Sequence, residues 1–193
     1  MPLTPKILAF AGSTREGSFN KKLVKVAAEA ARAAGAEVTL LDLRELDLPM
    51  YDGDLETSQG LPPGGRKLKD LMLAHHAFLI SAPEYNSSIS AVLKNAIDWA
   101  SRPVAGQKPL ECFDGKIAAL MSASPGALGG LRMLVHLRAI LENIGTFVLP
   151  KQVAISKAHE AFDENGSLKD PAQEKKIQQL CAELTEVIRR LKS

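Results

Sequence analysis

The stretch from residue 10 to residue 20, Phe-Ala-Gly-Ser-Thr-Arg-Glu-Gly-Ser-Phe-Asn, gathers groups that bind a phosphate ester. Ser13, Thr14 and Ser18 supply hydroxyl donors, and Arg15 supplies a guanidinium whose fork fits a phosphate. The stretch leaves an apolar run and enters a helical pattern. The first N–H groups of a helix have no partner within it, and the helix dipole is positive there. The sequence therefore predicts an anion-binding loop at a helix start.

This loop does not follow the common phosphate-binding patterns. Ser18 stands after Gly17 where a P-loop requires Lys, the G-x-G-x-x-G pattern of dinucleotide sites is missing, and no Cys begins a phosphatase loop. A simpler alternative stays open, namely an ordinary turn with a helix cap at Ser18. We favour the anion site because four phosphate-type donors in one turn exceed what capping requires.

Two later turns could surround a group attached to that phosphate. Residues 83–88, Pro-Glu-Tyr-Asn-Ser-Ser, carry an aromatic ring, an amide and hydroxyls that could flank a flat ring and bond its edge. Residues 122–130 are rich in small side chains, which let a ligand approach the backbone closely. Taken alone, each turn could instead be explained by helix capping or by packing between a helix and a strand. The three turns together are more specific than any one of them.

Apolar runs and helical spacing predict the elements that would position these turns. Five strands are expected, at residues 6–11, 37–43, 77–82, 116–121 and 147–155, and the first of them is interpreted as a buried parallel strand. Helical faces are expected at residues 23–34, 66–75, 90–101, 134–144 and 170–192. Pro150 lies within the fifth strand, which indicates a sheet edge or a bulge. Residues 46–65 are interpreted as a long loop.

The alternation of strands and helices predicts one α/β domain over residues 1–193, with a doubly wound, five-stranded parallel sheet. The common strand order for such a sheet is 2-1-3-4-5, and ligands bind at the carboxyl ends of strands near the switch point. The three turns follow the first, third and fourth strands. In this order they would converge on one crevice.

Composition and spacing exclude several classes of function. The net charge is +2 and the 24 Lys and Arg are spread out, which disfavours nucleic acid and anionic membranes as partners. The first apolar run is too short for a signal peptide or a membrane span. Cys112 and Cys181 form no CxxC pair, so a reducing cytoplasm is expected. His136 and His159 have no partners at metal-ligand spacing, and G-x-S-x-G is missing. No metal and no catalytic side chain are therefore assigned.

These motifs resemble those of the NADPH-dependent FMN reductase family, which includes bacterial chromate and quinone reductases. G-S-x-R-x-x-S-x-N at 12–20 is similar to the family's phosphate loop. P-E-Y-N at 83–86, followed by L-K-N-A-I-D-W at 93–99, is similar to its second and more specific hallmark. S-P-G-x-x-G-G at 124–130 is similar to a third. One departure is Ile-Ser-Ala at 89–91, where the family often has an apolar residue, Pro and Gly.

The resemblance implies a flavodoxin-like fold that binds FMN noncovalently. The residues that it implies around the FMN phosphate are Ser13, Arg15, Ser18, Phe19 and Asn20. Those implied along the isoalloxazine ring are Pro83, Glu84, Tyr85 and Asn86. Those implied on the other side of the ring are Ser122, Ser124 and Gly126.

The activity implied is hydride transfer from NADPH or NADH through FMN to quinones or similar small acceptors, among them chromate, azo compounds or free flavin. Members of the family are homodimers or homotetramers. The cofactor performs the redox chemistry, which fits the lack of an assigned catalytic side chain. Arg102 is a guess for a contact with the NADPH 2′-phosphate. Two alternatives stay open: an FMN-binding electron carrier or redox sensor without substrate turnover, and an α/β enzyme that binds another phosphate ester.

Overall fold

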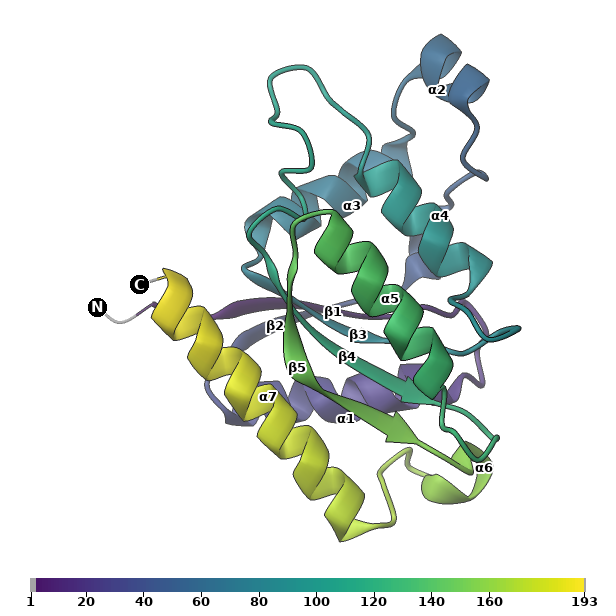
Figure 1. Cartoon of the computed structure of the whole chain (residues 1–193), viewed down its shortest axis with the longest axis vertical. Coiled ribbons are helices and arrows are strands. Elements are labelled where there is room, and N and C mark those ends of the chain that lie inside the picture. The colour runs from purple at the N-terminus through teal and green to yellow at the C-terminus, as the bar shows by residue number, and fades with distance from the viewer. Residues whose placement is uncertain (1–2, 193) are drawn as a thin grey trace.

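A parallel β-sheet of five strands organises the computed structural model, which describes residues 3–192 (Figure 1). In chain order the strands are β1 (Lys6–Ala11), β2 (Glu37–Leu41), β3 (Ala77–Ser81), β4 (Ile117–Ala123) and β5 (Phe147–Ile155). They lie in the order β2-β1-β3-β4-β5, and each neighbouring pair is parallel. The predicted doubly wound α/β fold and its strand order are confirmed.

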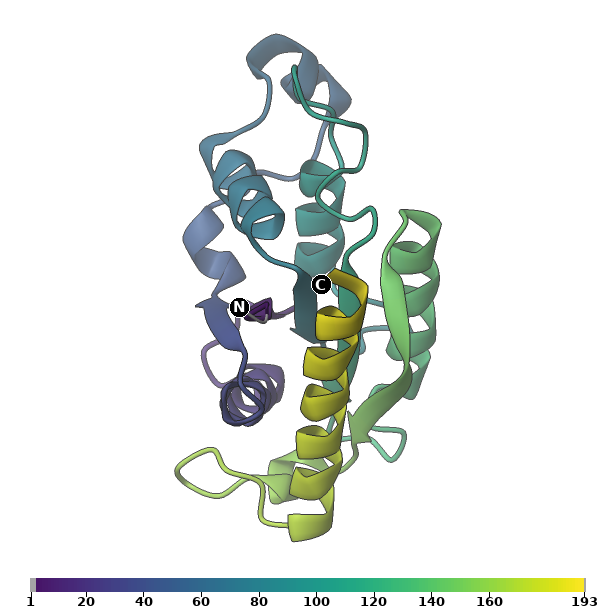
Figure 2. The ribbon, with the colours of Figure 1, turned by 90° about the vertical axis from the view of Figure 1, so that its left-hand side faces the viewer.

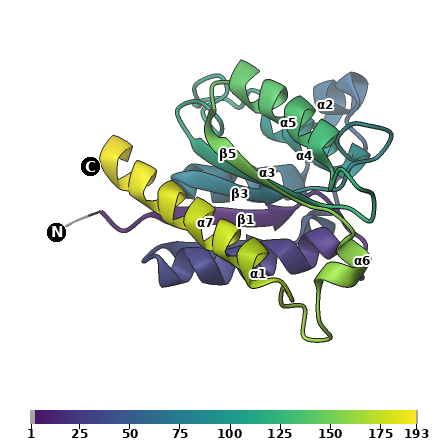
Figure 3. The same ribbon diagram turned by 60° about the horizontal axis from the view of Figure 1, so that its bottom comes forward.

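Helices cover both faces of this sheet. They are α1 (Phe19–Ala33), the 3-10 turn η1 (Leu43–Leu46), α2 (Gly53–Gln59), α3 (Pro63–Ala74), α4 (Ala91–Ala100), α5 (Leu131–Asn143), α6 (Ala158–Ala161) and α7 (Pro171–Lys192). Helices α1 and α7 lie on one face, and α3, α4 and α5 lie on the other (Figure 3). Helix α2 projects at one end of the molecule, as Figure 2 shows from the side.

The sheet separates two apolar layers. Successive residues of a strand point to opposite faces, so β1 contributes Ile7 and Ala9 to the layer under α1 and α7, and Leu8 and Phe10 to the layer under α3, α4 and α5. All four side chains are buried. This burial on both faces explains why the strand reads as a continuous apolar run.

The stretch predicted as one long loop, residues 46–65, holds helix α2 and the start of α3, so that prediction is wrong. The Asp52 carboxylate caps α2 by accepting hydrogen bonds from the N–H groups of Asp54 and Leu55, at 2.7 and 3.3 Å. Helix α2, Gly53–Gln59, buries none of its residues, so no apolar periodicity marks it in the sequence. Helix α3 begins at Pro63, a residue suited to the first helical position, earlier than its apolar face suggests.

Other boundaries differ from the predictions by a few residues. Helix α1 begins at Phe19, because Ser18 caps it before the first apolar position. Strand β2 ends at Leu41, since the Asp42 side chain caps the 3-10 turn that follows. Strand β4 continues to Ala123, so the third turn starts later than expected.

Pro150 lies in β5, which is an edge strand, and the pairing of β4 with β5 shifts register between Ala118 and Leu120. Both features agree with the expectation of an edge or a bulge. The Arg138 guanidinium of α5 donates to the carbonyls of Leu149 and Pro150, at 2.7 and 3.3 Å. The Arg138 side chain therefore supplies hydrogen bonds to carbonyl groups of β5 at Pro150 and the residue before it.

Within residues 3–192, no helix has both the length and the apolar character that crossing a membrane requires.

Candidate functional site

The three polar turns meet at the carboxyl ends of β1, β3 and β4. Gly12, in the turn after β1, donates its N–H to the Ser81 carbonyl at the end of β3, at 2.9 Å. The Ser90 hydroxyl donates to the Gly12 carbonyl at 2.6 Å and also caps α4. A Cβ on Gly12 would lie 2.9 Å from Cβ of Ala82 and 3.0 Å from Cδ2 of Leu93. Glycine thus permits the first and second turns to touch.

Asn20, in the first turn of α1, ties all three strand ends together. Its Nδ2 donates to the Ala123 carbonyl at 2.9 Å, and its Oδ1 accepts from the Ala123 N–H and the Ser81 hydroxyl, each at 2.9 Å. Its side chain is buried, with the residue 2% exposed. The amide therefore makes three internal hydrogen bonds and has a scaffold task, and the expected contact of Asn20 with the phosphate stays a prediction.

The turn between β1 and α1 keeps the features of an anion site. Ser18 caps α1 by accepting from the Lys21 N–H at 3.4 Å, and Ser13 accepts from the Arg15 N–H at 3.4 Å. Each of these hydroxyls keeps its own hydrogen for a further acceptor. The first turn of α1, residues 19–22, carries no acidic side chain. The N–H groups at the start of the helix lack intrahelical acceptors, so they also face outward from its end.

A stack of charged and aromatic side chains flanks the same turn. The Arg15 guanidinium carbon lies 5.8 Å from the ring centroid of Phe19. The Phe19 ring stacks on the ring of Phe162, with centroids 6.2 Å apart and an interplanar angle of 8°. The Lys22 Nζ atom lies 5.9 Å from the Phe162 centroid. Phe162 lies far along the chain, after α6, and no local sequence signal connects it with this turn.

The turn after β3 is tight and partly left-handed. Tyr85 and Ser88 exchange two backbone hydrogen bonds of 3.0 Å each. The two residues between them, Asn86 and Ser87, have φ of 50° and 66°, as in a type I′ turn. Tyr85 is 54% exposed, so its ring is free to meet a ligand. Such a non-glycine backbone is uncommon and is often found at binding sites.

The Glu84 side chain caps a neighbouring helix, and the expected contact of this residue with the ring stays a prediction. Its carboxylate accepts from the N–H groups of Arg132 and Met133 at 3.1 and 3.4 Å, and it forms an ion pair with the Arg132 guanidinium. It thereby caps α5, whose N-cap is Gly130 and offers no side chain. Burial alone would raise the pKa of Glu84, but these hydrogen bonds and the Arg132 charge outweigh burial, so the pKa lies below its ordinary value.

The turn after β4 divides into a buried part and an open part. Ser122 is fully buried and donates to the Ala82 carbonyl at 2.7 Å, which ties the second and third turns together and keeps it away from a ligand. A Cβ on Gly130 would collide with the hydroxyl of Ser122, and the φ of Gly130 is 92°, a value that favours glycine. Ser124 is half-buried and Gly126 is exposed, so this part of the turn faces outward as expected.

Arg102 does not lie at this edge. Its guanidinium donates to the Asp98 carbonyl at 3.0 Å and to the Tyr51 hydroxyl at 3.2 Å. It follows the far end of α4, about 18 Å along the helix from Ser90, at 1.5 Å per residue. The guess that Arg102 contacts the NADPH 2′-phosphate at this site therefore finds no support.

Three further side chains that can take part in chemistry, His75, Cys112 and Cys181, are buried inside the fold. The ring nitrogens of His75 lie 2.6 Å from the Leu71 carbonyl and 2.8 Å from the Thr39 hydroxyl. Both cysteines are buried, and burial raises the pKa of the Cys181 thiol to about 12. Across residues 3–192, no group of His, Cys, Asp or Glu is placed to hold a metal ion.

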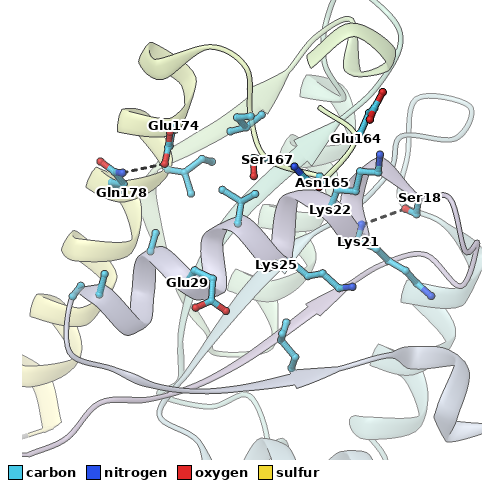
Figure 4. Close-up of a pocket in the computed structure, with 18 of the residues that line it drawn as sticks. Ser18, Lys21, Lys22, Lys25, Glu29, Glu164, Asn165, Ser167, Glu174 and Gln178 are labelled. Carbon is cyan, nitrogen blue, oxygen red and sulfur yellow. Dashed lines mark hydrogen bonds between the residues drawn. The ribbon is translucent and has the colours of Figure 1, made fainter. Parts of the chain in front are cut away.

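A hollow of about 990 Å³ lies beside the first turn, between α1, α7 and the loop at 164–168 (Figure 4). Only Glu16 and Ser18 of its lining belong to the first turn, and the Lys22 side chain extends toward Glu164. It touches neither the second nor the third turn. We place the candidate site at the convergent turns, because the phosphate-type donors lie there.

The chain matches the family model for NADPH-dependent FMN reductases over residues 5–160. An NAD(P)H-dependent FMN reductase of Pseudomonas aeruginosa is 38% identical over 188 residues, covering 97% of this chain and 97% of that protein. A probable NADPH:quinone oxidoreductase of Oryza sativa subsp. japonica is 35% identical over 173 residues, covering 88% of this chain and 82% of that protein. Among solved structures, the flavoenzyme NAD(P)H:(acceptor) oxidoreductase FerB of Paracoccus denitrificans is 32% identical, covers 97% of this chain and 98% of its own, and superposes with a TM-score of 0.82.

Proposed function

The chain belongs to the NADPH-dependent FMN reductase family, and we propose that it is an FMN-dependent NAD(P)H oxidoreductase that passes electrons to quinones or similar small acceptors. The observation that carries this proposal is the convergence of three polar turns on one sheet edge, beside a helix start with phosphate-type donors. Bound FMN supplies the redox chemistry, since it can accept a hydride from NAD(P)H and return the electrons to an acceptor.

The turn between β1 and α1 fits the phosphate end of FMN. We assign the phosphate to the hydroxyls of Ser13 and Ser18, the main-chain N–H groups of Phe19 and Asn20, and the Arg15 guanidinium. A phosphate monoester carries a charge of about −1.5 to −2 at neutral pH, which the helix end and Arg15 both favour. Asn20 contributes its backbone here, while its amide fixes the strand ends.

The second and third turns fit the flavin ring. The left-handed backbone at Asn86 turns the exposed Tyr85 outward, and Pro83 is buried behind them. We assign this turn to one side of the ring and the open part of the third turn, around Ser124 and Gly126, to the other. The main chain and small side chains would then set the orientation of the ring.

The protein's own groups orient and bind, and none is assigned to proton transfer. Glu84, the carboxylate in the second turn, is engaged by Arg132 and by the start of α5. His136 lies 3.0 Å, through Nδ1, from the Ser88 hydroxyl behind that turn. Both groups therefore stabilise the turn that would hold the ring.

We further propose that the protein acts as a homodimer or homotetramer. Leu128, in the third turn, and Leu131 and Val135, on α5, are exposed apolar side chains. A second copy of the chain would cover these side chains and close the site from outside. Light scattering behind size exclusion measures the oligomer directly, and a monomer at micromolar concentration would contradict this part of the proposal.

The function is tested by loading the purified protein with excess FMN and removing unbound flavin. The proposal predicts a yellow protein that oxidises NADPH when a quinone is added. A protein that stays colourless after desalting would contradict it. The relatives cited above are named as an FMN reductase and a probable NADPH:quinone oxidoreductase, which favours an enzyme over an electron carrier or a sensor.

A further inference from the structure

We propose that Lys21, Asp42 and Arg44 form a positioning network that fixes the phosphate loop, residues 12–18, and thereby sets the affinity for the phosphate of FMN. The proposal rests on the proposed function, because it concerns the same site. None of the three side chains is assigned a contact with the flavin. They act from behind the loop, at the end of β2.

The network converges on one carbonyl group. The Thr14 carbonyl accepts hydrogen bonds from Arg44 Nε at 3.0 Å and from Lys21 Nζ at 3.4 Å. Two cations therefore hold a single peptide oxygen in the middle of the phosphate loop. Hydrogen bonds from charged donors are stronger than neutral ones, so this carbonyl has a well-defined direction.

Asp42 connects the two cations into a closed ring. Its Oδ2 accepts from Lys21 Nζ at 2.6 Å, and its Oδ1 accepts from the Arg44 N–H at 3.0 Å. Burial alone would raise the pKa of Asp42, but the hydrogen bonds and charges of Lys21 and Arg44 outweigh it, and the pKa lies below its ordinary value. Arg44 reaches further to Glu16 at 3.2 Å, on the far side of the loop.

The direction of this carbonyl determines what the loop offers to a phosphate. The carbonyl of Thr14 and the N–H of Arg15 belong to one planar peptide and point in opposite directions. With the carbonyl held toward β2, the Arg15 N–H points to the Ser13 hydroxyl oxygen, 3.4 Å away. That oxygen then accepts from the protein, and its own hydrogen is directed elsewhere, to the phosphate in our assignment.

The side chains of Lys21 and Arg44 differ in burial, and so in how much their replacement would disturb the fold. The Lys21 side chain is 18% exposed, whereas that of Arg44 is 54% exposed, so replacing Arg44 threatens the fold less. Lys25 lies one helical turn beyond Lys21, is exposed and carries the same charge. It provides a matched control for loss of positive charge near the loop without loss of the network.

The test compares FMN with riboflavin, which lacks the phosphate, by flavin fluorescence quenching on titration with the apoprotein. We expect Lys21→Met and Arg44→Ala each to weaken FMN binding about fivefold. Riboflavin binding and the Lys25→Met control should stay within about twofold of the original protein. Arg44→Lys should recover only part of the FMN affinity, because a single ammonium cannot replace the guanidinium that bonds both Thr14 and Glu16. Thermal unfolding of each apoprotein identifies a variant that fails to fold. If Lys21→Met fails to fold, the FMN affinity of Arg44→Ala tests the network.

Three results would overturn the network. If Lys21→Met and Lys25→Met weaken FMN binding equally, the effect is a general loss of positive charge and not a property of the network. Equal weakening of FMN binding and riboflavin binding would indicate a loosened fold and not a change at the phosphate. Unchanged FMN binding in both network variants would show that the loop needs no support. An unmodified protein that binds neither flavin would overturn the proposed function itself and the network with it, a result distinct from the other three.

Discussion

Asn20 and Ala123 exchange two hydrogen bonds, each 2.9 Å long: the amide of Asn20 donates to the Ala123 carbonyl, and its oxygen accepts the Ala123 N–H. One side chain at the start of α1 thus completes the backbone bonding at the end of β4. The same oxygen accepts the Ser81 hydroxyl at the end of β3. This buried amide therefore links the first turn to the ends of β3 and β4, together with the hydrogen bonds of Gly12 to Ser81 and Ser90.

Replacing this amide should cost both stability and cofactor affinity. Asn20→Ala leaves buried groups of Ser81 and Ala123 without partners, so we expect about 3 kcal/mol less free energy of unfolding and weaker FMN binding. Urea unfolding and flavin titration measure the two effects. Asn165→Ala, in an exposed loop, is the control and should change neither. A fully stable Asn20→Ala protein would refute the role of this amide.

The contact between the first two turns depends on a missing side chain. Gly12→Ala places a methyl group 2.9 Å from Cβ of Ala82, so we expect the protein to lose about 2 kcal/mol of stability. Gly53→Ala, in α2, meets nothing within 4 Å and should leave stability the same or raise it slightly. Thermal unfolding of the two variants side by side makes the comparison. Equal stability of both would mean that the turns have room to separate.

The cap that Glu84 gives to α5 should make stability depend on pH in the acid range. Because the pKa of this carboxyl is lowered in the folded protein, its contribution is complete above its ordinary value of 4.5 and is lost as the pH falls through the folded value. Glu84→Gln should therefore cost about 1–2 kcal/mol at pH 7, and the difference from the original protein should shrink below the ordinary value. Urea unfolding across this range measures it. A difference that is constant with pH would contradict the charged cap.

The aromatic stack predicts that Phe162 supports Arg15 through Phe19. Phe162→Leu should weaken FMN binding about twofold in the original protein and have no further effect once Arg15 is replaced by Ala. Phe162→Tyr keeps the ring and serves as the control. Flavin titration of the single and double variants gives the coupling. The same loss in both backgrounds would show that Phe162 acts independently of Arg15.

Most of the fold could be predicted from the sequence because the three central strands, β1, β3 and β4, are buried on both faces and the larger helices carry apolar stripes. Helix α2 could not, since it buries none of its residues in the range Gly53–Gln59 and its only mark is the Asp52 cap. The cap at Ser18 could be predicted, because its signal is local. Contacts between segments that are distant in the sequence leave no such local signal.

The same distinction separates the site residues. The polar turns could be found from residue types, and the structure brings them together. Sequence alone could not show that Asn20, Glu84 and Ser122 turn inward, because their partners at Ala123, Arg132 and Ala82 lie on other elements. Polar residues in a turn can bind a ligand or hold the turn, and only the fold decides which. The ligand contacts of Ser13, Arg15 and Ser18 are proposals, since no partner within the protein decides them.

The most direct measurement follows the flavin absorbance of the FMN-loaded protein under anaerobic conditions. Mixing with NADPH should bleach the flavin band within a single turnover, and adding a quinone should restore it. An Arg15→Ala protein loaded at the same flavin occupancy should bleach equally, because Arg15 is assigned to binding and not to electron transfer. A protein that retains FMN but is not bleached by NADPH or NADH would contradict the assignment as an NAD(P)H oxidoreductase.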